Sequence, residues 1–178
     1  MSSGVELLVT GFGPFAGIED NPSSWLAERS GFPYEILPVS FRAVDEFLVR
    51  CMAAAPRKLL MLGVAAGRKQ LTPEIFAWNH IGAAADVDGE TRPGEIEDGE
   101  AFCRVSNLWQ VPQLARWVLS GTCGLSGTPG NYLCNFCLYR ALGMLPGTRI
   151  GFLHVPGDAH MDREQMQIHL STILRDVE

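Results

Sequence analysis

Short apolar runs alternate along this chain with longer segments in which apolar residues recur at helical spacing. Continuous apolar runs closed by glycine or polar residues are typical of buried parallel strands. These runs predict strands over residues 5–10, 34–39, 59–64, 74–78 and 150–154. Helical spacing predicts helices over 43–54, 108–119 and 161–175. Asn21 followed by Pro22 is a typical helix start and predicts a helix that continues to residue 27.

This alternation of strands and helices predicts an α/β fold. We expect one domain spanning 1–178, a three-layer α/β/α sandwich around a twisted, largely parallel (mixed) sheet. Ligands of such sheets bind at the carboxyl ends of the strands. The loops that follow Thr10, Gly63 and His154 should therefore meet at one edge of the sheet.

Composition excludes several classes of function. The chain is 47% hydrophobic and 19% charged, with a net charge of -6 and no basic cluster, which argues against nucleic-acid binding. It has no apolar run long enough to span a membrane and no signal peptide, so no membrane partner is expected. Five cysteines without a disulfide-framework spacing indicate a reducing, cytoplasmic environment.

Residues 130–135 contain the most informative cysteine. A glycine-rich approach leads to Cys134, which lies at the start of an apolar run with helical spacing. The positive end of a helix favours a thiolate over a thiol. Twenty positions later, His154 ends a predicted strand. This combination is a candidate thiol-hydrolase pair, although a cysteine in an apolar helix is more often an inert core residue.

Four segments together resemble the pyroglutamyl peptidase I family, also called pyrrolidone-carboxyl peptidases. They are residues 9–17 with Asn21-Pro22, residues 63–68 with 74–79, residues 126–135 with Tyr139, and residues 151–156. Members of this family are cytosolic cysteine peptidases that remove an N-terminal pyroglutamyl residue. The resemblance covers nearly the whole chain and also implies a homo-oligomer, either a dimer or a tetramer.

By position, the resemblance implies Cys134 as the nucleophile, His154 as the base and Glu74 as the third catalytic member. Cysteine, histidine and a carboxylate can form such a triad without a metal or another cofactor. The implied substrate is a peptide with an N-terminal pyroglutamate, whose neutral lactam ring suits a flat apolar slot. The residues that align with this slot and its entrance are Phe12, Phe15, Asn21, Val64, Tyr132 and Leu133.

This chain lacks one charged residue of the family pattern. The family has an arginine about ten residues after its glutamate, near the place where the tetrahedral oxyanion forms, and this chain has Ala84 at that position. Loss of such an oxyanion donor costs about 10²–10³ in turnover. Arg68 or Arg92 could replace the arginine from another loop. An enzyme of low efficiency and a binding or regulatory relative without useful turnover are therefore both consistent with the sequence.

Other patterns allow weaker alternatives. Cys134 and Cys137 form a Cys-x-x-Cys motif, so a thiol redox protein is a further hypothesis. The remaining histidines lack a metal-binding spacing. Residues 83–99 are rich in acidic residues, glycine and proline, which predicts a solvated loop or an irregular hairpin.

Overall fold

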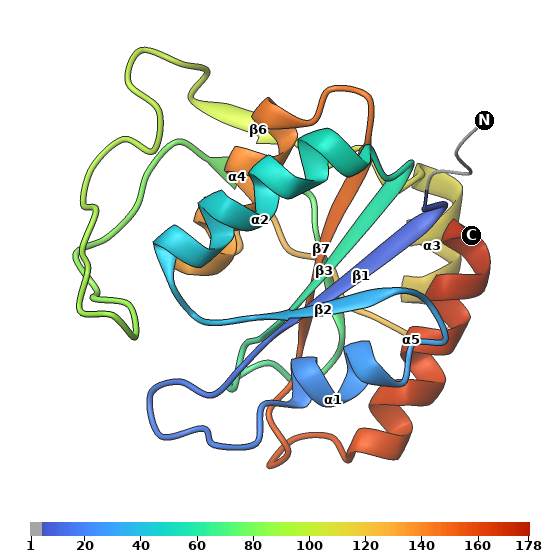
Figure 1. Ribbon diagram of the computed structural model, residues 1–178. Coiled ribbons are helices and arrows are strands. Elements are labelled where there is room, and N and C mark those ends of the chain that lie inside the picture. Colours follow the sequence, from blue (N-terminus) through green and yellow to red (C-terminus); the bar gives the residue numbers. More distant parts are fainter. Residues whose placement is uncertain (1–4) are drawn as a thin grey trace.

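The computed structural model describes residues 5–178 and contains a five-stranded sheet in the order β2-β1-β3-β7-β4. Figure 1 shows β2, β1, β3 and β7 side by side. Strands β2, β1, β3 and β7 are parallel, and β4 is antiparallel to β7. The bounds of these strands are β1 Leu7–Phe12, β2 Tyr34–Leu37, β3 Lys58–Val64, β4 Thr72–Glu74 and β7 Arg149–Val155. The predicted mixed, mostly parallel sheet is confirmed.

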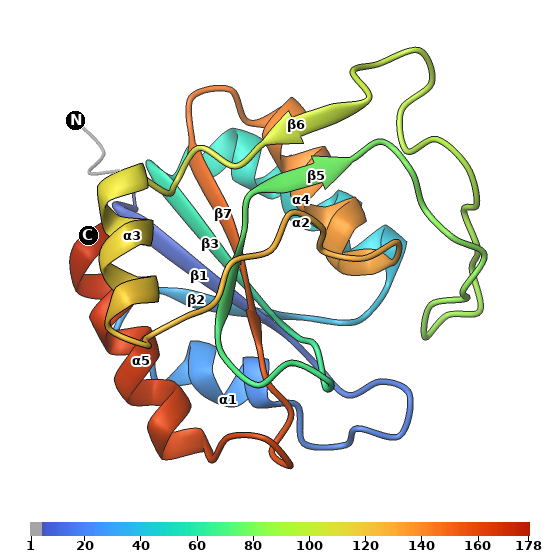
Figure 2. The ribbon, with the colours of Figure 1, turned by 180° about the vertical axis from the view of Figure 1, so that it is seen from behind.

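Helices cover both faces of the sheet, as the views from the two sides show (Figures 1 and 2). On one face lie α2 (Phe41–Ala54) and α4 (Leu133–Met144), and on the other lie α1 (Pro22–Glu28), α3 (Val111–Leu119) and α5 (Arg163–Val177). Strand β3 serves both layers, because Leu59 and Met61 belong to one apolar cluster and Leu60 and Leu62 to the other. This is the predicted three-layer sandwich. No helix within residues 5–178 is long and apolar enough to cross a membrane.

Most predicted elements differ from the observed ones by one or two residues at their ends, and two differ more. Residues 74–78 are not one strand, because the chain leaves the main sheet at Ile75, and β5 (Phe76–Trp78) pairs with β6 (Cys103–Val105) in a separate two-stranded sheet. Helix α3 begins at Val111 rather than at residue 108. Trp109, which precedes it, packs in the core and donates its indole N–H to the Glu74 carbonyl oxygen at 3.0 Å.

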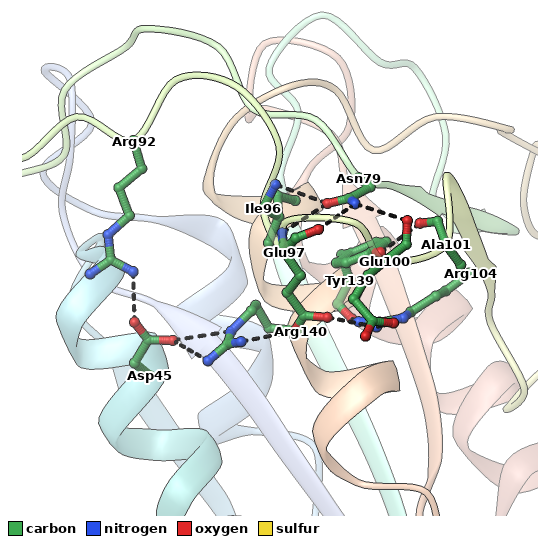
Figure 3. Close-up of polar contacts among 10 residues, drawn as sticks. All are labelled: Asp45, Asn79, Arg92, Ile96, Glu97, Glu100, Ala101, Arg104, Tyr139 and Arg140. Atoms are coloured by element: carbon green, nitrogen blue, oxygen red, sulfur yellow. Dashed lines mark hydrogen bonds and ion pairs between the residues drawn. The ribbon is translucent and has the colours of Figure 1, made fainter.

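The prediction of a solvated loop or an irregular hairpin over 83–99 is partly correct, and an antiparallel bridge between Ile81 and Gly94 fits the irregular hairpin. The segment forms no helix or strand, but buried polar side chains anchor it. The Asp86 carboxylate accepts the backbone N–H groups of Phe41, Asp88 and Glu90. The Asn79 side chain accepts two backbone N–H groups, those of Ile96 and Glu97, and donates to the Glu97 carbonyl oxygen (Figure 3). Local composition predicts polarity, but it does not predict these partners.

Ion pairs join the same region to helices α2 and α4 (Figure 3). Asp45 on α2 pairs with Arg92 at 2.6 Å and with Arg140 on α4 at 3.3 Å. Glu97 continues this network, since it pairs with Arg140 at 2.8 Å and with Arg104 at 2.6 Å. The network joins the second half of α4 to α2 and to the long loop.

Arg104 also reaches the middle of α4, and this contact explains a glycine in the helix. Its guanidinium lies 4.0 Å from the centre of the Tyr139 ring and donates to the Tyr139 carbonyl oxygen at 2.9 Å. A Cβ atom at Gly143 would lie 2.2 Å from Nη1 of Arg104. The absence of a side chain at Gly143 therefore leaves room for the guanidinium.

We expect Gly143→Ala to destabilise the fold by about 1–3 kcal/mol, because the guanidinium must leave its carbonyl and carboxylate partners. An exposed helix position without this contact would instead gain about 1 kcal/mol from the same change. The measurement is urea unfolding, with Gly147→Ala as the control, since no atom lies within 4 Å of a Cβ added there. Stabilisation by Gly143→Ala would contradict the role of Arg104.

Candidate active site

A pocket of about 420 Å³ opens at the carboxyl ends of β1, β3 and β7. This position confirms the expectation that the loops after these three strands meet at one edge. Eight of the nine predicted site residues line the pocket, and Glu74, the ninth, is fully buried and hydrogen-bonded to one of them. The lining is Phe12, Phe15, Asn21, Val39, Gly63, Val64, Ala65, Arg68, Thr128, Pro129, Gly130, Asn131, Tyr132, Leu133, Cys134 and His154.

Cys134 is the second residue of α4, where backbone N–H groups have no acceptor within the helix. Tyr132 at the N-cap gives no side-chain hydrogen bond to the helix start, so the Cys134 N–H is available to a ligand. Asn135 fixes this first turn: its buried amide accepts from the Trp78 N–H at 2.8 Å and donates to the Trp78 and His80 carbonyl oxygens. The local sequence around Asn135 does not predict this anchoring role, because Trp78 and His80 are distant in the chain.

The Cys134 sulfur lies directly over Gly63 in β3. A Cβ atom added at Gly63 would be 3.1 Å from Sγ of Cys134 and 2.6 Å from the Phe152 ring. Gly63 is the register partner of His154 in β7, and side chains of register partners lie on the same face of a sheet. Gly63 therefore leaves the space beside His154 that the cysteine sulfur occupies.

His154 and Glu74 form a buried pair. The His154 Nδ1 atom lies 2.7 Å from Oε1 of Glu74, and the antiparallel register of β4 and β7 brings the two residues together. Nε2 is thus the ring nitrogen left to exchange a proton at the pocket. This is the geometry in which a carboxylate holds the tautomer and orientation of a catalytic imidazole.

The electrostatic environment favours the imidazolium form of His154. Burial alone would lower the pKa of this histidine, but the neighbouring Cys134 sulfur and the Glu74 carboxylate outweigh burial and raise the pKa to about 9. At neutral pH His154 is therefore an imidazolium beside the Cys134 sulfur. An imidazolium next to a cysteine is a typical feature of cysteines that react as nucleophiles.

The predicted substrate-binding residues form the walls of the pocket. The Phe12 ring lies beside Phe152, with the ring centres 6.4 Å apart, and Phe15 is held by paired hydrogen bonds with Ile18 across the Ala16-Gly17 turn. Tyr132 donates its hydroxyl to the Ala85 carbonyl oxygen at 2.9 Å. The pocket wall is thus held in shape by contacts within the chain.

Asn21 is engaged with its own loop. Its amide donates to the Gly13 carbonyl oxygen at 3.0 Å and accepts from the backbone N–H and the hydroxyl of Ser23. These bonds show that Asn21 holds the entrance loop. Val64, at the end of β3, and Leu133, at the start of α4, complete the apolar part of the wall.

The two arginines considered as replacements for the missing one lie in different places. Ala84 is exposed, and Arg92 is held by Glu90 and Asp45 away from the pocket lining. Arg68 does line the pocket, and among its described residues it is the only lysine or arginine. Its Nη2 atom lies 2.8 Å from Oε1 of Glu74, so its charge acts first on the carboxylate.

The second cysteine of the Cys-x-x-Cys motif is placed for packing rather than redox chemistry. Cys137 is 0% exposed, and its sulfur lies 3.3 Å from the Met61 sulfur. Burial raises the pKa of the Cys137 thiol well above its ordinary value, which makes it a poor thiolate. A redox pair of Cys134 and Cys137 is not supported by this geometry.

The fold and the chemistry gathered at the pocket are those of a cysteine peptidase built on an α/β sandwich. The family model described as pyroglutamyl peptidase matches residues 5–166, and the chain belongs to this family. Its relatives include the pyrrolidone-carboxylate peptidase of Thermococcus onnurineus, which is 31% identical over 98% of this chain and 96% of that protein.

Solved structures agree with this assignment. The pyrrolidone carboxyl peptidase of Thermus thermophilus superimposes with a TM-score of 0.77 at 30% identity, covering 93% of this chain and 97% of that one. A mutant pyrrolidone carboxyl peptidase from Pyrococcus furiosus has a TM-score of 0.84 at 24% identity, with 96% of both chains covered. The latter likeness concerns the fold.

We expect Gly63→Ala to disturb the site, because the new methyl group must displace the Phe152 ring and press on the Cys134 sulfur. The rate of Cys134 alkylation by iodoacetamide should fall by about tenfold or more, and overpacking should cost about 1–3 kcal/mol of stability. The matched control is Gly67→Ala, four residues later, where no atom lies within 4 Å of an added Cβ. Equal alkylation rates in both variants would contradict this reading of Gly63.

Proposed function

We propose that this chain is a cysteine exopeptidase that hydrolyses the amide bond after an N-terminal pyroglutamyl residue. The observation that carries the proposal is the sulfur of Cys134 at a helix start, beside the buried His154–Glu74 pair in an apolar pocket. Membership of the pyroglutamyl peptidase family supports the choice of substrate. The nucleophile is Cys134, the general acid and base is His154, and Glu74 orients the imidazole.

The reaction proceeds in two acyl-transfer steps. The Cys134 thiolate attacks the pyroglutamyl carbonyl, and the backbone N–H of Cys134 and the α4 dipole stabilise the oxyanion. His154 then gives its proton to the leaving amine as the C–N bond breaks, which yields a thioester and a shortened peptide. In the second step neutral His154 takes a proton from water, the hydroxide adds to the thioester, and pyroglutamate leaves as the thiol re-forms.

The pocket suits a neutral lactam ring. Phe12, Phe15, Val64, Tyr132 and Leu133 supply mostly apolar surface, and Asn21 holds the loop that carries the two phenylalanines. An uncharged ring loses little hydration in such a slot, whereas a free amino terminus would be desolvated without a carboxylate partner. The pocket therefore favours pyroglutamate over an ordinary N-terminal residue.

The absence of an arginine at Ala84 favours one alternative, a relative of low turnover that binds pyroglutamyl peptides. The five free cysteines support a reducing cytoplasmic location, and a homo-oligomer stays a prediction from the family resemblance. Neither the location nor the oligomer is needed for the chemistry above.

The first test is hydrolysis of a fluorogenic pyroglutamyl amide by the purified chain. We expect release of the fluorophore, complete loss of the activity in Cys134→Ala, and no cleavage of the matching prolyl amide, which carries a charged amine. Fluorophore release no faster in the parent than in Cys134→Ala would reject the peptidase. Binding of the pyroglutamyl amide without hydrolysis would favour the alternative.

The pH dependence should report the buried histidine pair. The pKa of His154, raised to about 9 by Cys134 and Glu74, keeps the imidazolium that protonates the leaving amine. We therefore expect kcat/KM to fall about tenfold per pH unit above about pH 9. Glu74→Gln removes the charge that favours the imidazolium, so this limb should move to lower pH by about 1–3 units and turnover should drop. An unmoved limb in Glu74→Gln would remove Glu74 from the mechanism.

A further inference from the structure

Arg68 makes three contacts that link separate parts of the site. It lies in the turn after β3, where its N–H donates to the Ala65 carbonyl oxygen. Its Nη2 atom lies 2.8 Å from Oε1 of Glu74 and 3.1 Å from both Oγ of Ser126 and the carbonyl oxygen of Thr128. One guanidinium nitrogen thus joins the β3 loop, strand β4 and the segment that leads to the nucleophile.

The segment around Ser126 is part of the same arrangement. It runs alongside residues 71–75 between α3 and α4 (Figure 2), and the Ile75 N–H donates to the Ser126 carbonyl oxygen at 3.0 Å. The Ser126 hydroxyl also accepts the Thr128 N–H at 3.1 Å. Six residues after Thr128 the chain reaches Cys134, so Arg68 contacts both the carboxylate behind the histidine and the approach to the sulfur.

The Glu74 carboxylate needs such a partner. It is 0% exposed, its Oε1 atom is hydrogen-bonded to His154 and forms an ion pair with Arg68, and its Oε2 atom has no hydrogen-bond partner among the described residues. The attraction of one histidine alone does not offset the desolvation of a buried carboxylate. The Arg68 side chain, which is 26% exposed, balances the negative charge of Glu74 and contacts the same carboxylate oxygen that faces His154.

We propose that Arg68 is a positioning residue of the reaction, which acts through Glu74 on His154 and holds residues 126–128 in front of the nucleophile. This inference rests on the proposed peptidase function. Three groups act on the imidazole, each from a different element: Glu74 from β4, Cys134 from α4 and, through Glu74, Arg68 from the β3 loop. Since Cys134 and Glu74 both favour the imidazolium, the positive charge of Arg68 opposes them.

The effect of the Arg68 charge on His154 matters because the two steps of the reaction need different protonation states of the imidazole. The leaving amine needs an imidazolium, but hydrolysis of the thioester needs neutral His154 to activate water. A carboxylate shared with Arg68 stabilises the imidazolium less than a carboxylate that serves His154 alone. Arg68 thus lowers the affinity of His154 for a proton, so that the imidazole stays neutral in the acyl-enzyme and can take a proton from water.

The experiment compares Arg68→Gln, Arg68→Lys and Ser126→Ala with the parent in pyroglutamyl-amide hydrolysis over pH 6–11. Removal of the charge in Arg68→Gln should move the alkaline limb of kcat/KM upward by about one pH unit and lower kcat at pH 8 about tenfold. Arg68→Lys and Ser126→Ala keep the charge and loosen the geometry. They should lower kcat a few-fold and leave the limb in place. Arg42→Gln, which removes an exposed arginine paired with Asp88, is the matched charge control and should change neither quantity.

Three results would overturn the proposal: an alkaline limb in Arg68→Gln that matches the parent, an equal upward shift in Arg42→Gln, or an unchanged kcat in Arg68→Lys. A loss of kcat in Arg68→Gln without a shift of the limb would instead indicate a direct oxyanion contact, and it would also contradict the proposal. If Arg68→Gln does not fold, as judged by thermal unfolding, Arg68→Lys and Ser126→Ala carry the test. Inactivity of the parent enzyme would reject the peptidase function itself, which is a separate outcome.

Discussion

The site depends on one physical constraint: a carboxylate, that of Glu74, is fully buried beneath the pocket. A buried charge is tolerated only with close partners of opposite charge or with good donors. His154 and Arg68 supply them, and each comes from a different strand or loop of the sheet. The antiparallel strand β4 is therefore as important to the chemistry as the parallel strands, because only its pairing with β7 brings Glu74 beneath the imidazole.

The space beside the His154–Glu74 pair depends on the missing side chain of Gly63. Gly63 has no side chain where the Cys134 sulfur and the Phe152 ring approach the sheet, so the nucleophile can lie next to His154. Asn135 then holds the first turn of α4 to the end of β5 through three hydrogen bonds. The position of the sulfur thus depends on close approach to the sheet from one side and on polar anchoring from the other.

The layers of the fold could be predicted from the sequence because apolar runs and helical spacing are local signals. The cap of α1 at Asn21 was found in this way, and so were the loops at the carboxyl ends of β1, β3 and β7. The break at Ile75 was not, since the choice between two sheets depends on distant partners such as Cys103–Val105 and Ser126. Cys134 and His154 were candidates from their places at a predicted helix start and strand end, and the other seven site residues came from position in a family pattern. The bonds of Asn135 and Arg68 required coordinates.

Few positively charged side chains reach the pocket, because most of the nearby arginines are paired elsewhere. Arg92, Arg104 and Arg140 are all paired within the network that fixes the 79–104 region, and Ala84 carries no charge. The Nη2 atom of Arg68 forms an ion pair with Glu74 and donates to Ser126 and Thr128. In the proposed mechanism, stabilisation of the oxyanion therefore rests mainly on the Cys134 N–H and the dipole of α4, both of which are fixed by the backbone and need no side chain. A site of this kind gains rate from the rigidity of the helix start, and the three hydrogen bonds of Asn135 supply that rigidity.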